Sequence, residues 1–288
     1  MALKKDTAGS YMFLAPAAVI YVSVVVFPVF YSLVVSLFKW NGIAKMEFIG
    51  IGNFTSLFGD PVFHKAISNN LKWIILSLFA TMTISLGFAV ILNKQFRGRT
   101  FFRGYFYFPA VIAPIAVAII WRWIYNPSFG FINQFLKYLH INFRQTWISD
   151  PAASIYAIFG ASVWQGMGGP MLFFLAGLQT VPEEVLEAAT IDGASNPKRF
   201  FLITIPMMKE TFVIVIANLV VGAMKVFDIV MGLTAGGPNN ATQMMSFYMY
   251  SQTFRYHNVG YGTAIAVLMV IFMMIVIVPY VSFTARKD

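Results

Sequence analysis

The sequence of 288 residues has no cysteine and carries little charge. Without cysteine, the chain has no disulfide, no thiolate nucleophile and no thiolate metal ligand. Charged residues make up only 11% of it, whereas about 25% is usual in a globular domain. Hydrophobic residues make up 59%, and the mean hydropathy is +0.73. Because so few charges cannot cover a water-exposed surface, the composition predicts a protein that lies in a lipid bilayer.

The side-chain groupings that catalysis and metal binding need are also missing. The three histidines, His64, His140 and His257, are far apart and show no zinc-site spacing. There is no membrane-buried carboxylate pair, no Ser–His arrangement and no phosphate-binding Gly-x-x-x-x-Gly-Lys-Ser/Thr loop. The net charge is +9, but the basic residues lie at the ends of apolar segments, which disfavours nucleic-acid binding. We therefore expect no catalytic residue, no metal site, no bound cofactor and no nucleic-acid partner.

Six segments are apolar over about the 20 residues that a helix needs to cross the hydrocarbon core. They predict an all-α, polytopic membrane protein. The first segment is too long for a signal-peptide core and has no convincing cleavage site, so we interpret it as a retained membrane helix. The predicted helices cover residues 11–38, 68–93, 105–125, 151–180, 207–235 and 259–284.

The distribution of basic residues predicts the orientation of these helices. The densest basic cluster, residues 94–103, lies between the second and third helices, and basic residues favour the cytoplasmic side. The same side would carry Lys4, Lys5, Lys198, Arg199, Lys209, Arg286 and Lys287. We therefore expect a multi-pass protein of a bacterial cell membrane with both termini in the cytoplasm. The opposite connections, 39–67 and 126–150, are rich in aromatic residues that either contact the lipid headgroups or bind an external partner.

Residues 180–206 are too polar to cross the membrane, yet they are patterned for two short helices. Thr180 and Glu183 have the spacing of a capping box, and Pro182 suits the first turn. Gly193 is placed to end the first helix in the left-handed conformation. The residues alone leave two interpretations open: an amphipathic loop packed on the helix bundle, or a binding element for a cytoplasmic protein.

The second short helix would begin at Pro197, with Ser195 or Asn196 as its cap. The stretch "EAATIDGASNPKRFFLITIP" then resembles the EAA signature of binding-protein-dependent ABC importer permeases. Isoleucine stands at Ile205, where leucine is usual in that signature. The residues that match it in type and spacing are Glu187, Ala188, Ala189, Gly193, Ile203 and Pro206.

Four further stretches are similar to segments of sugar permeases of this family. They are "FLAPAAVIYVSVVVFPVFYSLVVSLF", "FIGIGNF", "WQGMGGPMLFFLAGLQTVP" and "FDIVMGLTAGGPNNATQ", so that the resemblance covers nearly the whole chain. It implies a type I ABC importer permease architecture. An N-terminal helix and outer loop would occupy residues 1–66, a transmembrane domain residues 67–284, and a cytoplasmic tail residues 285–288.

The resemblance also implies a function and its partners. The chain would be the permease subunit of an ATP-driven importer of an oligosaccharide, or of glycerol-3-phosphate or a polyol. A secondary carrier is disfavoured because Asp228 is the only carboxylate deep in an apolar segment. The implied partners are a second, homologous permease, two ATPase subunits that bind the ATP, and an external solute-binding protein. ATPase coupling would involve Glu183, Glu187, Ala188, Ala189, Asp192, Gly193 and Pro206.

The fourth and fifth predicted helices hold the candidates for a solute pathway. The glycines and proline of "WQGMGGP" indicate either a broken helix at a solute site or close helix packing. Lys225 and Asp228 are spaced to share one face of the fifth helix, either as a pathway wall or as an ion pair. Resemblance to maltose-type permeases implies solute contacts from Gln165, Gly166, Gly169, Leu219, Gly222, Ala223, Lys225 and Val226. Several of these are small or apolar, so the chain could line the pathway while its partners select the solute.

Overall fold

The computed structural model describes residues 7–141 and 145–285. The described residues do not include four of the basic residues used to predict the orientation, Lys4, Lys5, Arg286 and Lys287, or most of the predicted tail at 285–288. Contacts group the chain into two units, residues 1–60 with 249–270 and residues 61–248 with 271–288.

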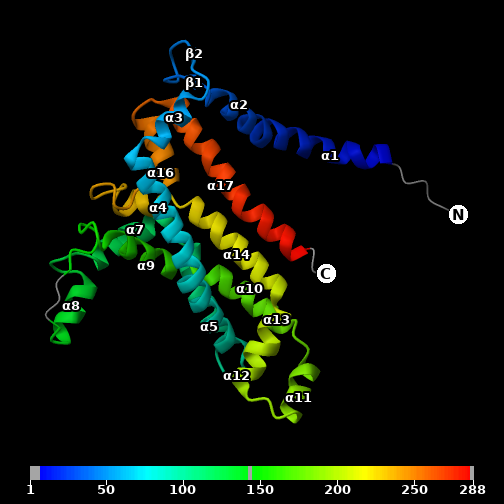
Figure 1. The fold of residues 1–288 in the computed structure, drawn as a ribbon. Helices are drawn as coiled ribbons and strands as arrows, with labels where there is room; N and C mark the ends of the chain where they lie inside the picture. The colour runs from blue at the N-terminus through cyan, green and yellow to red at the C-terminus, as the bar shows by residue number, and fades with distance from the viewer. Residues whose placement is uncertain (1–6, 142–144, 286–288) are drawn as a thin grey trace. The chain divides into compact units, whose positions relative to one another are not determined.

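The first unit combines a long apolar helix with a small hairpin (Figure 1). Met12–Val35 form a single apolar span of 24 residues, which confirms the first predicted helix. Asn53 Nδ2 donates to the carbonyl oxygens of Ser36 (2.8 Å) and Phe38 (2.9 Å), and Phe38 lies opposite Phe48 in the antiparallel hairpin. The elements are α1 (Thr7–Tyr21), the π-helix η1 (Val22–Val26), α2 (Phe27–Val35), β1 (Phe38–Lys39), β2 (Glu47–Phe48), α3 (Gly52–Phe58), the π-helix η5 (Ser251–Arg255) and the N-terminal part of α17 (Val259–Ala285).

The beginning of α17 packs closely against the hairpin of the same unit. The Gly260 amide donates to the Trp40 carbonyl (3.1 Å), and a Cβ at Gly260 would lie only 1.9 Å from the Phe38 carbonyl oxygen. Tyr261 Oη donates to Asp60 Oδ2 (2.7 Å). α17 contains a continuous apolar span over residues 259–282, which confirms the sixth predicted helix.

The second unit contains one long, unbroken helix. α4 (Pro61–Leu76), the π-helix η2 (Ser77–Thr81) and α5 (Met82–Asn93) form an apolar span of 33 residues, which confirms the second predicted helix. α5 and α14 (Lys209–Met224) both contact α10 (Gly168–Gln179), beside which they lie in Figure 1. A buried core joins these helices, formed by Ala89, Leu92, Met171, Phe174, Leu175, Met208 and Val215.

The other three predicted spans are bent pairs of helices rather than straight ones. The predictions of single helices over 105–125 and 151–180 are wrong because each range contains a bend, although up to six spans remain if each pair is one span. The predicted helix over 207–235 is wrong at its C-terminal part, because α14 ends at Met224 and a separate helix begins at Asp228. α6 (Arg99–Tyr107) and the 3₁₀-helix η3 (Phe108–Val111) meet α7 (Pro114–Ile124) at 98°; α9 (Ser154–Gly166) meets α10 at 48°; α12 (Asn196–Arg199), the π-helix η4 (Phe200–Thr204) and α13 (Ile205–Met207) meet α14 at 73°.

Proline explains two of these bends. Ala113, just before Pro114, has an extended backbone with ψ 132°, as a residue before proline prefers, so a helix cannot run through it. Pro170 has no N–H to donate to the Gly166 carbonyl, which removes one helical hydrogen bond where α9 ends. The remaining helices of this unit are α8 (Phe131–Tyr138), α11 (Glu183–Ile191), α15 (Asp228–Leu233) and α16 (Met245–Tyr250), whose last two residues belong to the first unit.

Candidate functional site

The polar segment 180–206 forms a tight elbow of α11 and α12, and Gly193 makes its turn. Gly193 has φ +78°, a left-handed conformation that glycine adopts without strain. The Ala194 amide donates to the Ala189 carbonyl (2.9 Å) and the Gly193 amide to the Thr190 carbonyl (3.0 Å), which are the two hydrogen bonds of a Schellman motif. The prediction that Gly193 ends this helix is confirmed.

The predicted start of the same helix is partly wrong. Thr180 does not form a capping box with Glu183, because its hydroxyl donates to the Gly177 carbonyl (2.8 Å) at the end of α10. The residue before α11 is Pro182, which makes no side-chain cap. Thr180 thus belongs to the preceding helix, where a bond three residues back competes with the cap.

Arg199 holds the two helices of the elbow together. Its Nη1 donates to Thr190 Oγ1 and lies 3.5 Å from the Leu186 carbonyl, both on α11. Its Nη2 donates to Asn196 Oδ1 on α12. The sequence indicated only a basic patch at Lys198 and Arg199, since nothing in the pattern shows which cation turns back onto α11.

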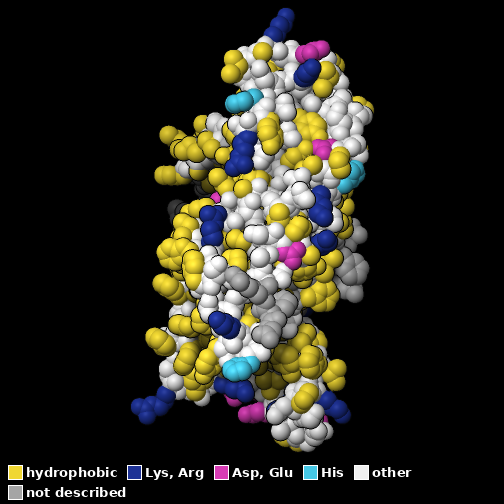
Figure 2. Space-filling view, turned by 90° about the vertical axis from the view of Figure 1, so that its left-hand side faces the viewer, with side chains coloured by type: hydrophobic (Ala, Val, Ile, Leu, Met, Phe, Trp, Pro, Cys, Tyr) yellow, Lys and Arg dark blue, Asp and Glu magenta, His cyan; other side chains and the backbone are white. Residues whose placement is uncertain are grey.

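The outward surface of the elbow carries carboxylates beside exposed apolar side chains, of which Ile191 is the most exposed. Ile191 is 87% exposed, and Ala189 is buried. Figure 2 shows acidic and basic side chains at the lower end of the visible face, where Figure 1 places α11 and α12. Pro206 lies further along the chain in α13 and is exposed, apart from the turn. The exposed predicted residues of the elbow itself are Glu183, Glu187, Ala188, Asp192 and Gly193.

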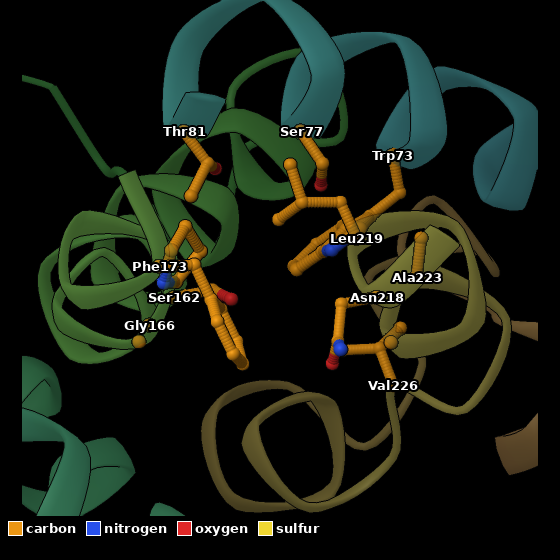
Figure 3. A pocket seen from close by; sticks show the side chains of 13 residues that line it. Trp73, Ser77, Thr81, Ser162, Gly166, Phe173, Asn218, Leu219, Ala223 and Val226 are labelled. Atoms are coloured by element: carbon orange, nitrogen blue, oxygen red, sulfur yellow. The ribbon is translucent and has the colours of Figure 1, made fainter. Parts of the chain in front are cut away.

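A cavity of about 350 Å³ lies between four helical segments of the second unit (Figure 3). Its wall contains two aromatic side chains and several uncharged hydrogen-bonding groups. None of its lining residues is ionisable. Figure 3 shows Ser77 and Thr81 reaching into it from η2, opposite Asn218 and Val226. The lining residues are Trp73, Ser77, Thr81, Ser162, Gly166, Gly169, Pro170, Phe173, Asn218, Leu219, Gly222, Ala223 and Val226.

Six of the eight residues proposed for the solute pathway line this cavity: Gly166, Gly169, Leu219, Gly222, Ala223 and Val226. A Cβ added to any of the three glycines among them would meet no atom of this chain within 4 Å. At Gly168, by contrast, an added Cβ would lie 2.8 Å from Tyr107 Cα. Close helix packing therefore explains Gly168, whereas the other three glycines leave open space.

The remaining two residues, Gln165 and Lys225, are not among the lining residues. Gln165 Nε2 donates to the Ile112 carbonyl (2.9 Å) at the bend between η3 and α7. The prediction that Lys225 and Asp228 share a helical face is wrong, because α14 ends at Met224 and α15 begins at Asp228. Both side chains are exposed on the surface of the chain.

The contribution of the long helix to this cavity was not predicted. Trp73, Ser77 and Thr81 are spaced four residues apart, which places them on one face of a helix. That spacing was available as a signal within an otherwise apolar segment. Ser162 and Asn218 were also missed, because a single polar residue in an apolar helix does not reveal which neighbour it faces.

Residues 82–286 match the family described as "Binding-protein-dependent transport system inner membrane component". A "Probable ABC transporter permease protein" of Pyrococcus horikoshii is 33% identical over 96% of this chain and 96% of its own length. The multiple sugar-binding transport system permease protein of Streptococcus mutans is 31% identical over 91% of this chain and 90% of its own. The trehalose/maltose transport system permease protein of Thermococcus litoralis is 30% identical, covering 94% and 91%.

Solved structures show the same fold. A chain in the crystal structure of a bacterial ABC transporter that imports the acidic polysaccharide alginate aligns with a TM-score of 0.83 at 20% identity, covering 96% of this chain and 94% of that one. A chain of the alginate transporter in complex with a periplasmic protein that holds an alginate pentasaccharide aligns with a TM-score of 0.84, also at 20% identity. The matched family and its relatives extend over most of the sequence, and the chain belongs to the binding-protein-dependent transport system inner membrane components, the permeases of ABC transporters.

Proposed function

We propose that this chain is the permease subunit of an ATP-driven importer and that its cavity forms part of the path of an uncharged carbohydrate. The observation that carries the proposal is the cavity wall. It offers hydroxyl groups, an amide and aromatic faces, the groups that orient polar, uncharged ligands. Two of the relatives above are named as permeases for sugars.

The same wall favours a neutral sugar or polyol over glycerol-3-phosphate. All thirteen lining residues are described, and none is Lys, Arg or His. A phosphate group that leaves water needs cationic or several N–H partners. A neutral hydroxylated solute needs only hydrogen-bond partners, which the wall supplies.

We further propose that a separate ATPase subunit binds the elbow around Glu187 and Ile191. A surface of carboxylates beside exposed apolar side chains, on a turn made rigid by Arg199, suits a protein–protein contact. Two such ATPase subunits, a second homologous permease and an external solute-binding protein would complete the importer. ATP would be bound by the ATPase subunits, and this chain would be non-catalytic, with both termini in the cytoplasm.

Purification of the tagged full-length chain from its native cells tests the coupling. The wild-type chain should bring down an ATPase, and Glu187→Lys should reduce its recovery by at least about tenfold, because a reversed charge meets an interface selected for a carboxylate. Glu47→Lys, the same change in the β2 hairpin, is the matched control and should retain it. Full recovery of the ATPase with Glu187→Lys would refute the elbow assignment.

Uptake into energised vesicles tests the solute class. With ATP and the matching binding protein present, radiolabelled neutral sugars or polyols should accumulate and glycerol-3-phosphate should not compete. Accumulation of glycerol-3-phosphate in place of every neutral solute would overturn the assignment to uncharged carbohydrates.

A further inference from the structure

Two adjacent asparagines, Asn69 and Asn70, lie fully inside the protein on the long apolar helix. Each is only 1% exposed, and both belong to α4. A buried side-chain amide destabilises a protein unless its hydrogen bonds are made, so the partners of these two residues indicate their role.

Asn70 caps the ends of two other helices with one side chain. Its Nδ2 donates to the Ala223 carbonyl (2.8 Å), and its Oδ1 accepts from the Met245 amide (2.8 Å). Ala223 lies in the last turn of α14, and Met245 is the first residue of α16. Groups at these positions have no partner within their own helix. One amide therefore satisfies a carbonyl and an N–H that are 22 residues apart, since 245 − 223 = 22.

Asn69 binds the segment between those two helix ends. Its Nδ2 donates to the carbonyl oxygens of Ala241 and Gln243, both at 2.9 Å. Ser246 Oγ also donates to the carbonyl of Val226, two residues after the end of α14. The chain from the end of α14 to the start of α16 is thus tied to α4 at both ends.

The end of α14, which Asn70 binds, forms part of the cavity wall. Ala223 and Val226, on either side of the end of α14, both line the cavity. Trp73, which follows Asn70 by one helical turn, lines it from α4. The side chain of Asn70 therefore joins two walls of the same cavity.

We propose that Asn70 is a positioning residue of the solute pathway, which fixes the end of α14 and the start of α16 to α4 and so holds Ala223 and Val226 in the cavity wall. Within a membrane, no water is present to replace a lost partner of a main-chain group. Without Asn70, the Ala223 carbonyl and the Met245 amide must find other partners, which shifts the chain around Val226. The inference rests on the proposed function only where it concerns a solute.

The absence of cysteine makes a direct test possible, because a single introduced thiol is the only one in the chain. Val226→Cys reports on the wall held by Asn70, and Gly166→Cys reports on the facing wall. A small, water-soluble methanethiosulfonate is applied to the full-length chain in its native membranes. The rate at which the thiol is modified is measured on the gel band of this chain.

The matched control is Ser85, which is also buried and also donates across helices. Its hydroxyl bonds to the Met167 carbonyl (2.8 Å), next to Gly166 on the facing wall. Asn70→Leu should change the rate of modification of the thiol at position 226 by about tenfold, the factor that corresponds to one buried hydrogen bond, and leave the rate at position 166 unchanged. Ser85→Ala should alter the rate at position 166 and leave the rate at position 226 unchanged. If the Asn70→Leu protein does not accumulate, Asn70→Ser is used in its place. Serine keeps one of the two hydrogen bonds, so the modification rate at position 226 should change in the same direction but by a smaller factor.

Equal changes at both reporters would show general loosening of the bundle and overturn the proposal, as would an unchanged rate at position 226. Neither reading depends on a solute or an ATPase. Failure of the importer proposal is detected separately, by loss of ATPase recovery and of uptake in the wild-type chain.

Discussion

Gly166 and Gly168 stand two residues apart and in opposite surroundings. The first opens onto the cavity, and the second packs against the backbone of Tyr107. Neighbouring glycines in one motif therefore have different roles, which sequence patterns cannot separate because both roles require a missing side chain.

Alanine at these two positions should distinguish the roles. Gly168→Ala places a Cβ against main-chain atoms that cannot readily move aside, and it should cost about 1–3 kcal/mol, as overpacking does. Gly166→Ala meets only open space and should leave stability unchanged or slightly higher. Thermal unfolding of the two purified variants in detergent measures this difference, and equal melting temperatures would contradict it.

The candidate site was partly predictable at the level of residues. Six of the residues that resemblance to maltose-type permeases singled out line the cavity, and two of them, Gly166 and Gly169, lie in a stretch that carries the resemblance. Gln165 lies in the same motif but bonds to the Ile112 carbonyl, a main-chain atom 53 residues earlier that no pattern reveals. Trp73, Ser77 and Thr81 lie outside those motifs, so only their helical spacing could have pointed to them.

Among the helices, proline did not by itself predict where a span bends. Pro170 and Pro114 lie at bends of 48° and 98°, whereas Pro16 and Pro279 lie within α1 and α17, which continue past them. The difference lies in the neighbours. At the bend next to Pro114, Gln165 supplies a hydrogen bond to the Ile112 carbonyl, and such tertiary partners are invisible in a local pattern.

The elbow depends on one arginine, and its removal should free α11. Arg199→Ala deletes the hydrogen bonds to Thr190, Leu186 and Asn196, and a partly exposed cation of this kind contributes roughly 1 kcal/mol or somewhat more. Cleavage after the α11 glutamates by a glutamyl endopeptidase should become about three- to tenfold faster.

Lys198→Ala is the matched control for that experiment. Lys198 is the exposed neighbour of Arg199 in α12, so its loss should leave the cleavage rate unchanged. Equal acceleration in both variants would mean that the elbow is held by something other than the Arg199 guanidinium.

For the whole molecule, the six spans predict that the hairpin and the elbow lie on opposite sides of the membrane. Ile43, beside the hairpin, is 91% exposed, and Ile191 in the elbow is 87% exposed. With cysteine at position 43, a membrane-impermeant maleimide should label intact spheroplasts. With cysteine at position 191, it should label only after the membrane is opened, because the basic clusters favour a cytoplasmic elbow. Labelling of both from the same side would reverse or refute this topology.

The double cap of Asn70 also constrains how the sequence of such a protein can diverge. Both of its partners are main-chain groups. Every residue at 223 has the carbonyl, and every residue at 245 except proline would have the N–H. No substitution at 223 or 245 can therefore compensate for the loss of Asn70, and the identities at these two positions remain free of its influence. A contact that spans 153 residues of chain would leave no trace as paired changes between homologues. It would appear only as a single position confined to a side chain that offers a donor and an acceptor side by side.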